Sequence, residues 1–158
     1  MDFEVRRGSR SDVDRLERLW LALRAHHATL PAMPPVRTPE ASWDFRRGQY
    51  LEWLGGGGHT LLLAERDDEV IGYALVSVGA GAATWDIGDR VAEIETLSVL
   101  EGERGKGVGR ALTEAAAEVA KDAGAGSVAV GVAHTNENAI RFYEREGFKP
   151  FYVLMLIR

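Results

Sequence analysis

The sequence predicts one α/β (α+β) domain that spans residues 1–158 and is built on a mixed, mostly antiparallel central sheet. Short apolar or alternating segments bounded by turn residues are typical of strands, and the chain holds six to seven of them. Longer segments with apolar residues three and four positions apart are typical of helices, and about four of these flank the strands. No internal repeat or low-complexity linker interrupts the chain, which favours one domain over two.

The N-terminal third of the chain is expected to form one short strand followed by two helices. Residues 3–7 have an extended character and end at a Gly-Ser pair. Ser11 is suited to cap a helix, and the apolar residues that follow it at helical spacing predict a helix over 11–27. Prolines across 30–39 exclude helix and central strand there, so the second helix is expected from the last of them to Trp53.

The rest of the chain alternates between strand and helix. The turn at 67–69 joins two strands in a predicted hairpin, and Gly124 closes the longer of two further helices. These two helices are expected over 108–123 and 137–146. The remaining strands are expected over residues 59–66, 70–78, 91–100, 128–133 and 148–157.

Composition and charge exclude several classes of protein. Of the 158 residues, 46% are hydrophobic and 27% charged, which is typical of a soluble globular domain and not of a disordered chain. The formal net charge of −5 disfavours a protein that binds the phosphate backbone of nucleic acids. The chain has no cysteine, which excludes disulfides, Cys-ligated zinc and a thiolate nucleophile. No signal peptide or membrane span is evident, so we expect a cytoplasmic protein that binds neither nucleic acid nor membrane.

The most informative segment is a glycine-rich loop between a predicted strand and a predicted helix. It runs Arg104-Gly105-Lys106-Gly107-Val108-Gly109-Arg110. Glycines allow the backbone to approach a ligand closely, and the first N–H groups of a helix attract negative charge. Three basic side chains surround them, so the loop is suited to a phosphate or pyrophosphate group.

Two other phosphate-binding loops do not fit this segment. A Walker A loop requires a lysine directly after its last glycine, and Val108 occupies that position. A dinucleotide-binding loop requires a third glycine where Arg110 or Leu112 stands, and it follows the first strand of a parallel unit instead of antiparallel hairpins. A flexible turn without a ligand remains the alternative for a glycine cluster alone.

A second motif lies nearer the C-terminus. Residues 136–148 read NENAIRFYEREGF, with Ala139 and Tyr143 on one helical face. An ordinary amphipathic helix closed by Gly147 would explain this segment taken alone. Together and in this order, the two motifs resemble those of the GNAT superfamily of N-acetyltransferases. The matching residues are Arg104, Gly107, Gly109, Asn136, Ala139, Phe142, Tyr143, Gly147 and Phe148.

This resemblance implies that the chain binds acetyl-CoA. It covers residues 66–157 well and residues 1–65 only in the order of elements. The turn at Leu100-Glu101 lacks a proline that is frequent in the family, and segment 25–58, where acceptor specificity usually resides, has no family signature. By resemblance, the residues that contact the coenzyme are Leu97, Ser98, Val99, Arg104, Gly105, Lys106, Gly107, Val108, Gly109, Arg110, Asn136, Ala139 and Phe142.

Acetyl transfer to an amine needs a base for the amine proton, a polarised thioester carbonyl and an acid for the leaving thiolate. Strand alternation is expected to place Glu93 and Glu95 on one face, together with Leu97 and Val99. By resemblance, Glu95 is the favoured base, Glu93 the alternative base and Tyr143 the acid. Both carboxylates could instead be solvated or salt-bridged charges at a strand end.

The sequence therefore predicts an enzyme that moves an acetyl group directly from acetyl-CoA to a primary amine in a ternary complex. The acceptor is expected to be a small-molecule or peptide amine, and a homodimer is left open. An idle acyl-CoA-binding or sensing module is the alternative, against which the intact Glu95 and Tyr143 argue. No third ligand accompanies His26 and His27, so no metal is expected. The aromatic residues expected to pack in the core or a lid are Trp43, Tyr50 and Trp53.

Overall fold

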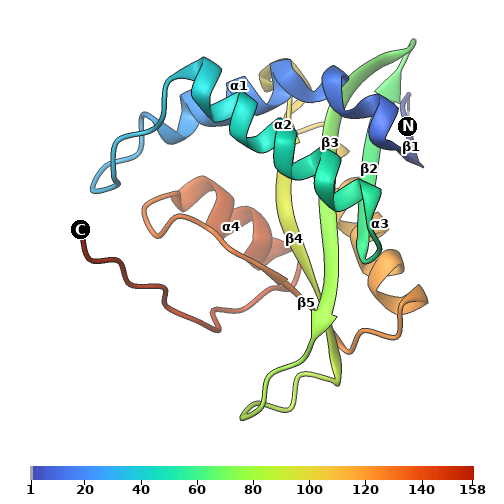
Figure 1. Ribbon diagram of the computed structural model, residues 1–158, viewed down its shortest axis with the longest axis vertical. Coiled ribbons are helices and arrows are strands. Elements are labelled where there is room, and N and C mark those ends of the chain that lie inside the picture. Colours follow the sequence, from blue (N-terminus) through green and yellow to red (C-terminus); the bar gives the residue numbers. More distant parts are fainter. Residues whose placement is uncertain (1) are drawn as a thin grey trace.

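The computed structural model describes residues 2–158 and contains one sheet of five strands (Figure 1). The strands are β1 (Glu4–Arg7), β2 (His59–Arg66), β3 (Glu69–Ala80), β4 (Arg90–Val99) and β5 (Ser127–Val130). They lie side by side in chain order, and neighbours pair antiparallel except for β4 and β5, which are parallel. A helix connects these last two strands, as a parallel connection requires. The mixed, mostly antiparallel fold predicted from the sequence is therefore confirmed.

Helices cover both faces of the sheet. On one face lie a 3₁₀ segment, η1 (Arg10–Leu16), and the helices α1 (Glu17–His27) and α2 (Pro39–Gly55) (Figure 1). On the other face lies α3 (Val108–Asp122), the helix that connects β4 to β5. The short helix α4 (Glu137–Arg145) follows β5 at the edge of the sheet.

Each face of the sheet has its own hydrophobic core. Along β2, Leu61 and Leu63 face α1 and α2, whereas Leu62 and Ala64 face α3. Successive residues of a strand point to opposite faces, so a slip of one residue would exchange the two cores. This alternation fixes the register of the inner strands, including β4, on which the candidate site is built.

The two ends of the chain differ from the sequence prediction. The strand expected over 148–157 does not form, because residues 148–158 pair with no strand in the described part of the chain. The prediction of six to seven strands is therefore wrong: apolar, strand-like composition does not supply the neighbouring backbone that a strand needs. At the other end of the chain, the N-cap of the first helical segment is Ser9 and not Ser11.

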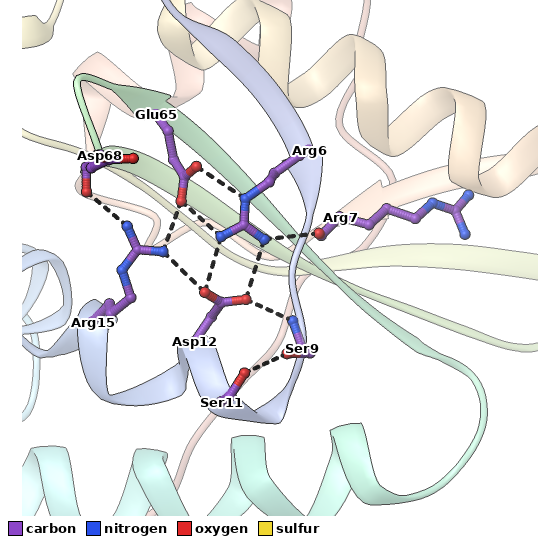
Figure 2. A network of polar contacts seen from close by, with 8 residues as sticks. All are labelled: Arg6, Arg7, Ser9, Ser11, Asp12, Arg15, Glu65 and Asp68. Carbon is purple, nitrogen blue, oxygen red and sulfur yellow. Dashed lines mark hydrogen bonds and ion pairs between the residues drawn. The ribbon is translucent and has the colours of Figure 1, made fainter.

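A network of charged side chains joins β1, η1 and β2 (Figure 2). The guanidinium of Arg6 lies 3.0 Å from Asp12 and 2.8 Å from Glu65, and that of Arg15 lies at the same distances from the same carboxylates. These contacts lower the pKa of Asp12 to about 2, chiefly through its hydrogen bonds with Arg6. We call Arg6, Asp12, Arg15 and Glu65 the N-terminal network, and it holds the start of the chain on the sheet.

None of the helices in residues 2–158 combines the length and apolar character that a membrane crossing requires. The same residues contain no group of three or more His, Cys, Asp or Glu side chains arranged to hold a metal ion.

Candidate active site

The centre of the candidate site is a β-bulge in β4. Two residues of β3 stand opposite three residues of β4, at 94–96, so Glu95 is an extra residue without a pairing partner. A bulge of this kind bends the strand and re-aims its side chains, and bulges are frequent next to active sites. The carboxylate of Glu95 accepts a hydrogen bond from the hydroxyl of Ser77 on β3 at 2.8 Å, which fixes its orientation.

The bulge changes which face the side chains of β4 point to. Before it, Ile94 packs in the core under α3, and after it Leu97 and Val99 pack against that same core. Ser98 points the other way, and its hydroxyl donates a hydrogen bond to the carbonyl of Leu19 in α1 at 2.9 Å. The prediction that Leu97 and Val99 share a face with the two glutamates is therefore wrong, because the extra residue reverses the alternation.

Glu93 and Glu95 lie on the face that α1 and α2 cover. Glu93 is next to Ile94, which is buried under α3, so Glu93 points to the opposite face. Ser77, which donates the hydrogen bond to Glu95, is next to Val76, which is also buried under α3, so Ser77 and Glu95 lie on that opposite face too. Glu93 is exposed at the surface, and partial desolvation of its carboxylate, and then repulsion by Glu95, raise its pKa. Neither carboxylate forms an ion pair with another side chain of the described residues. Carboxylates without a cationic partner are suited to accept a proton.

β4 and β5 separate at the bulge. They pair over residues 91–94 and 127–130 only. β5 ends at Val130 and not at Ala133 as predicted, whereas β4 continues to Val99. Beyond the bulge, the backbone of β4 is therefore free of a strand on its outer side. A ligand with amide groups, such as the pantetheine arm of coenzyme A, can hydrogen-bond there.

The glycine-rich loop leads from β4 into α3. Gly105 has φ +76° and Gly107, the N-cap of α3, has φ +87°, a conformation that favours glycine. A Cβ at either position would meet nothing within 4 Å, so both positions have open space beside them. The first helical hydrogen bond runs from the N–H of Ala111 to the carbonyl of Gly107, which leaves the N–H groups of 108–110 without a helical acceptor. These groups fit a pyrophosphate.

The basic side chains of the loop are weakly held. Lys106 lies 3.5 Å from Glu103, and Arg110 lies 3.1 Å from Glu114. Arg104 forms no ion pair within residues 2–158. Exposed pairs of this kind contribute little, so the three cations can turn toward a bound anion.

The second motif lies directly against this loop. The side chain of Asn136 caps α4 by accepting a hydrogen bond from the N–H of Ala139 at 3.3 Å. One turn further, the ring of Phe142 packs on Gly109, where an added Cβ would lie 3.2 Å from the ring. The contact explains why a glycine is needed in the first turn of α3. It also brings together the two motifs that are far apart in the sequence.

Tyr143 is the buried residue of α4. Its side chain is 9% exposed, and its ring meets those of Phe142 and Phe148 edge-to-face, with centroids 5.0 and 5.3 Å away. Burial raises the pKa of Tyr143 to about 12, so the hydroxyl keeps its proton at neutral pH. The hydroxyl has no hydrogen-bond partner among residues 2–158, which leaves it able to donate to a ligand.

A cation surrounded by three aromatic rings, which we call the aromatic box, lies over the bulge. This cluster was not predicted from the sequence. Arg46 of α2 lies over the rings of Trp20, Tyr50 and Trp53 at 4.8, 5.2 and 5.5 Å, and donates a hydrogen bond to Thr96 at 3.2 Å. The hydroxyl of Tyr50 donates to the same Thr96 oxygen at 2.6 Å. Arg46, Tyr50 and Trp53 are four and three positions apart, so helical spacing could have placed them together.

Comparison with known proteins decides the family. The model of the acetyltransferase (GNAT) family matches residues 22–148. The chain belongs to this family. An uncharacterized N-acetyltransferase from Mycobacterium bovis is 32% identical over 123 residues, which cover 75% of this chain and 74% of that protein. Mycothiol acetyltransferase from Thermobispora bispora is 33% identical over 148 residues, covering 91% of this chain and 46% of the relative. Streptothricin acetyltransferase from Streptomyces lavendulae is 37% identical over 122 residues, covering 75% and 60%.

Solved structures share the fold of this GNAT chain. A GCN5-related N-acetyltransferase from Ralstonia eutropha aligns with a TM-score of 0.79 at 20% identity, over 99% of this chain and 98% of the other. An aminoglycoside N-acetyltransferase in complex with CoA aligns with a TM-score of 0.75 at 18% identity, over 99% and 93%. At these identities the structures show the fold alone. The family model and the relatives make the chain an acetyl-CoA-dependent acyltransferase, as the two motifs implied.

Proposed function

We propose that this GNAT protein transfers an acetyl group directly from acetyl-CoA to a primary amine in a ternary complex. The observation that carries the proposal is the contact of Phe142 with Gly109, which brings the two motifs together where β4 and β5 separate. The open side of β4, the first N–H groups of α3 and the tyrosine of α4 then border one region. Glu93 and Glu95 approach it from the face covered by α1 and α2.

The coenzyme side of the site is formed by the loop and the open part of β4. The N–H groups of 108–110 and the cations Arg104, Lys106 and Arg110 would hold the pyrophosphate. The backbone of Leu97, Ser98 and Val99 would hydrogen-bond the pantetheine arm, and an N–H there would polarise the thioester carbonyl. In α4, the small Ala139 would leave room beside Tyr143.

The acceptor side must remove a proton from an ammonium group. A lysine-like amine with a pKa near 10.4 costs about 4–5 kcal/mol to neutralise at pH 7. Glu95, oriented by Ser77, would take this proton directly or through a water molecule. Glu93 is the alternative base, since its raised pKa makes its carboxylate a better proton acceptor. Repulsion between the two carboxylates also favours a cationic acceptor beside them.

Tyr143 would donate the proton to the leaving thiolate. Its pKa of about 12 keeps the hydroxyl protonated at neutral pH, and a general acid requires this. Thiolate formation would otherwise leave a charge in a site bordered by Phe142 and Phe148.

The names of the relatives favour a small-molecule acceptor. Two of them are a mycothiol acetyltransferase and a streptothricin acetyltransferase, and one fold neighbour is an aminoglycoside N-acetyltransferase. We therefore propose a polar small-molecule amine and treat a peptide amine as second. A cytoplasmic location completes the proposal, in keeping with a chain that has no cysteine.

The test is ligand-induced stabilisation followed by turnover. Acetyl-CoA at about 100 times its Kd should raise the free energy of unfolding by roughly 2.7 kcal/mol, whereas NAD and ATP at the same concentration should do less. A panel of polar primary amines is then screened for the release of free CoA thiol. Binding without turnover on any amine would favour the idle acyl-CoA-binding module, and absence of stabilisation by acetyl-CoA would contradict both functions.

A further inference from the structure

Arg46 of α2 is held over the bulge of β4 without a negatively charged partner. Its guanidinium forms no ion pair with a carboxylate of residues 2–158 and lies instead in the aromatic box. The side chain is half-buried, and its Nε is buried without a hydrogen-bond partner. A partly desolvated cation without a counter-charge costs free energy, and costs of this kind are common at functional sites.

The guanidinium of Arg46 keeps hydrogen-bond donors for a ligand. Of the five N–H groups of an arginine, one on Nη1 binds the side-chain oxygen of Gln49 at 3.0 Å, and one on Nη2 binds Thr96 at 3.2 Å. The N–H of Nε is buried, so one N–H on each of the two terminal nitrogens is left for an acceptor outside the described residues. Two such groups match the two oxygens of a carboxylate, which arginine binds bidentately.

The proposed base lies beside this cation. Thr96, which accepts the hydrogen bond from Arg46, directly follows Glu95, and consecutive Cα atoms are about 3.8 Å apart. Glu95 lies on the face that α1 and α2 cover, and so does Thr96, because Tyr50 of α2 donates a hydrogen bond to it at 2.6 Å. Both charges act on the hydroxyl of Tyr50: burial raises its pKa, Arg46 opposes this rise and Glu95 adds to it. A positive and a negative group are therefore held next to each other over one stretch of β4.

We propose that the acceptor is an amino acid, whose carboxylate binds Arg46 while its ammonium group lies at Glu95 or Glu93. This inference rests on the proposed function, because it names the class of amine that the same site takes. An amino acid matches both charges of the site, whereas an amine without an acidic group leaves Arg46 without a counter-charge. A carboxylate fits better than a phosphate, since the aromatic box holds a single cation and the two glutamates would repel a dianion.

The charges of the acceptor change during the transfer. The amine nitrogen forms a bond to the acetyl carbon and the C–S bond of the thioester breaks, while Glu95 or Glu93 takes the amine proton and Tyr143 gives its proton to the thiolate. The N-acetylated amino acid is then an anion, and its amide carries no charge for the glutamates to attract. We therefore expect the product to bind more weakly than the substrate.

The first experiment compares matched acceptors on the wild-type protein. Each standard amino acid is tested for release of free CoA thiol, together with its carboxamide and with the amine that lacks the carboxylate. The best amino acid should have a kcat/KM about 10–100-fold above that of its carboxamide, which is the gain from charge-assisted hydrogen bonds. The carboxamide has the less basic amine, so amine reactivity alone would favour it. Carboxamides that react as well as the free acids would overturn the proposal.

The second experiment tests whether Arg46 causes the preference. Arg46→Met removes the charge and keeps an unbranched side chain among the rings, and the ratio of acid to carboxamide should fall to about 1. A merely structural role would lower kcat/KM for both acceptors alike. Arg46→Lys keeps the charge without the paired N–H groups and should give an intermediate ratio, which also decides the matter if Arg46→Met does not fold. The matched control is Arg37→Met, since this exposed arginine lies over the ring of Phe45 at 4.8 Å, and it should keep the wild-type ratio.

A binding measurement separates this inference from the proposed function. Arg46 lies over Trp20 and Trp53, so a carboxylate bound to it should change the tryptophan fluorescence of the CoA-bound protein, titrated with the same acceptors and no acetyl donor. Tighter binding of an acid than of its carboxamide, abolished by Arg46→Met, would support the carboxylate site even if no amine were acetylated, a result that would contradict the enzyme alone. Acetylation of amines without a preference for acids, or a preference that survives Arg46→Met, would overturn the inference and not the enzyme. Absence of both binding and acetylation of amino acids would overturn the inference as well.

Discussion

The N-terminal network and the bulge of β4 each bring two carboxylates together, but the surroundings change the pKa of these groups in opposite directions. In the network, Asp12 and Glu65 each contact two guanidinium groups, and the pKa of both carboxyls is lowered. At the bulge, Glu93 and Glu95 have each other as charged neighbours, and the pKa of Glu93 is raised. A residue type alone therefore does not separate a structural charge from a reactive one.

The difference lies in what surrounds each charge. A paired carboxylate is stabilised in its ionised form and contributes to folding, whereas an unpaired one beside a second carboxylate takes up a proton more readily. The cations follow the same division, because Arg15 faces carboxylates while Arg46 over the bulge faces aromatic rings. Substitutions at the bulge, and at Tyr143 of α4 beside it, should therefore lower catalysis, whereas substitutions in the N-terminal network should lower stability.

The largest expected effect is that of Tyr143→Phe. Loss of the hydroxyl removes the proposed proton donor to the thiolate, and kcat should fall by about 10²–10⁴-fold. The Kd of acetyl-CoA should change little, since the ring and its contacts with Phe142 and Phe148 remain. Steady-state kinetics and calorimetric titration together check both statements. A kcat equal to that of the wild type would remove Tyr143 from the chemistry.

A comparable loss is expected for Glu95→Gln, with a different dependence on pH. The amide can still accept the hydrogen bond from Ser77, so the geometry of the bulge should persist while the base is lost. Raising the pH should partly restore kcat/KM, because more of the acceptor amine is then neutral, and it should not restore Tyr143→Phe. The matched control is Glu93→Gln on the same face. A larger loss in the control than in Glu95→Gln would identify Glu93 as the base.

The sequence predicted the elements of the two motifs better than it predicted their contacts. The loop residues and Tyr143 lie at helix ends and on a helix face, which local spacing determines. The reversed alternation after Glu95 arises from how β3 and β4 pair, and no single strand encodes this. Residues 148–158 show the same limit: their composition favours an extended conformation, but a strand forms only where a neighbouring strand pairs with its backbone N–H and C=O groups. Arg46 in its aromatic box likewise required the docking of α1 beside α2.

A smaller effect, on coenzyme binding and not on catalysis or stability, is expected for a charge placed in the glycine-rich loop. Gly107→Glu places a carboxylate where the pyrophosphate is expected, and the Kd of acetyl-CoA should rise about 10²-fold. Part of any change would come from backbone strain, because Gly107 has φ +87°. Gly107→Ala measures that part without charge, and Gly102→Glu adds the charge where a Cβ meets nothing within 4 Å. Equal affinities for Gly107→Glu and Gly107→Ala would argue that the phosphates bind elsewhere.

The smallest effect on activity, and the clearest on stability, is expected for Asp12→Asn. The folded-state pKa of about 2 lies below the ordinary value of 3.8, so the ionised carboxylate stabilises the fold above pH 4, and this contribution is lost as the pH falls from about 4 to 2. Because Arg6 is partly exposed, we expect a loss of about 1–2 kcal/mol at pH 7, with kcat unchanged. Urea unfolding at a series of pH values should show a shallower acid decline in the variant. Glu93→Gln should behave oppositely, since a raised pKa means that its charged form is disfavoured in the fold, and its stability at pH 7 should not fall. If both substitutions lowered stability alike and left kcat intact, the bulge carboxylates would be structural, and the contrast between the two regions would not hold.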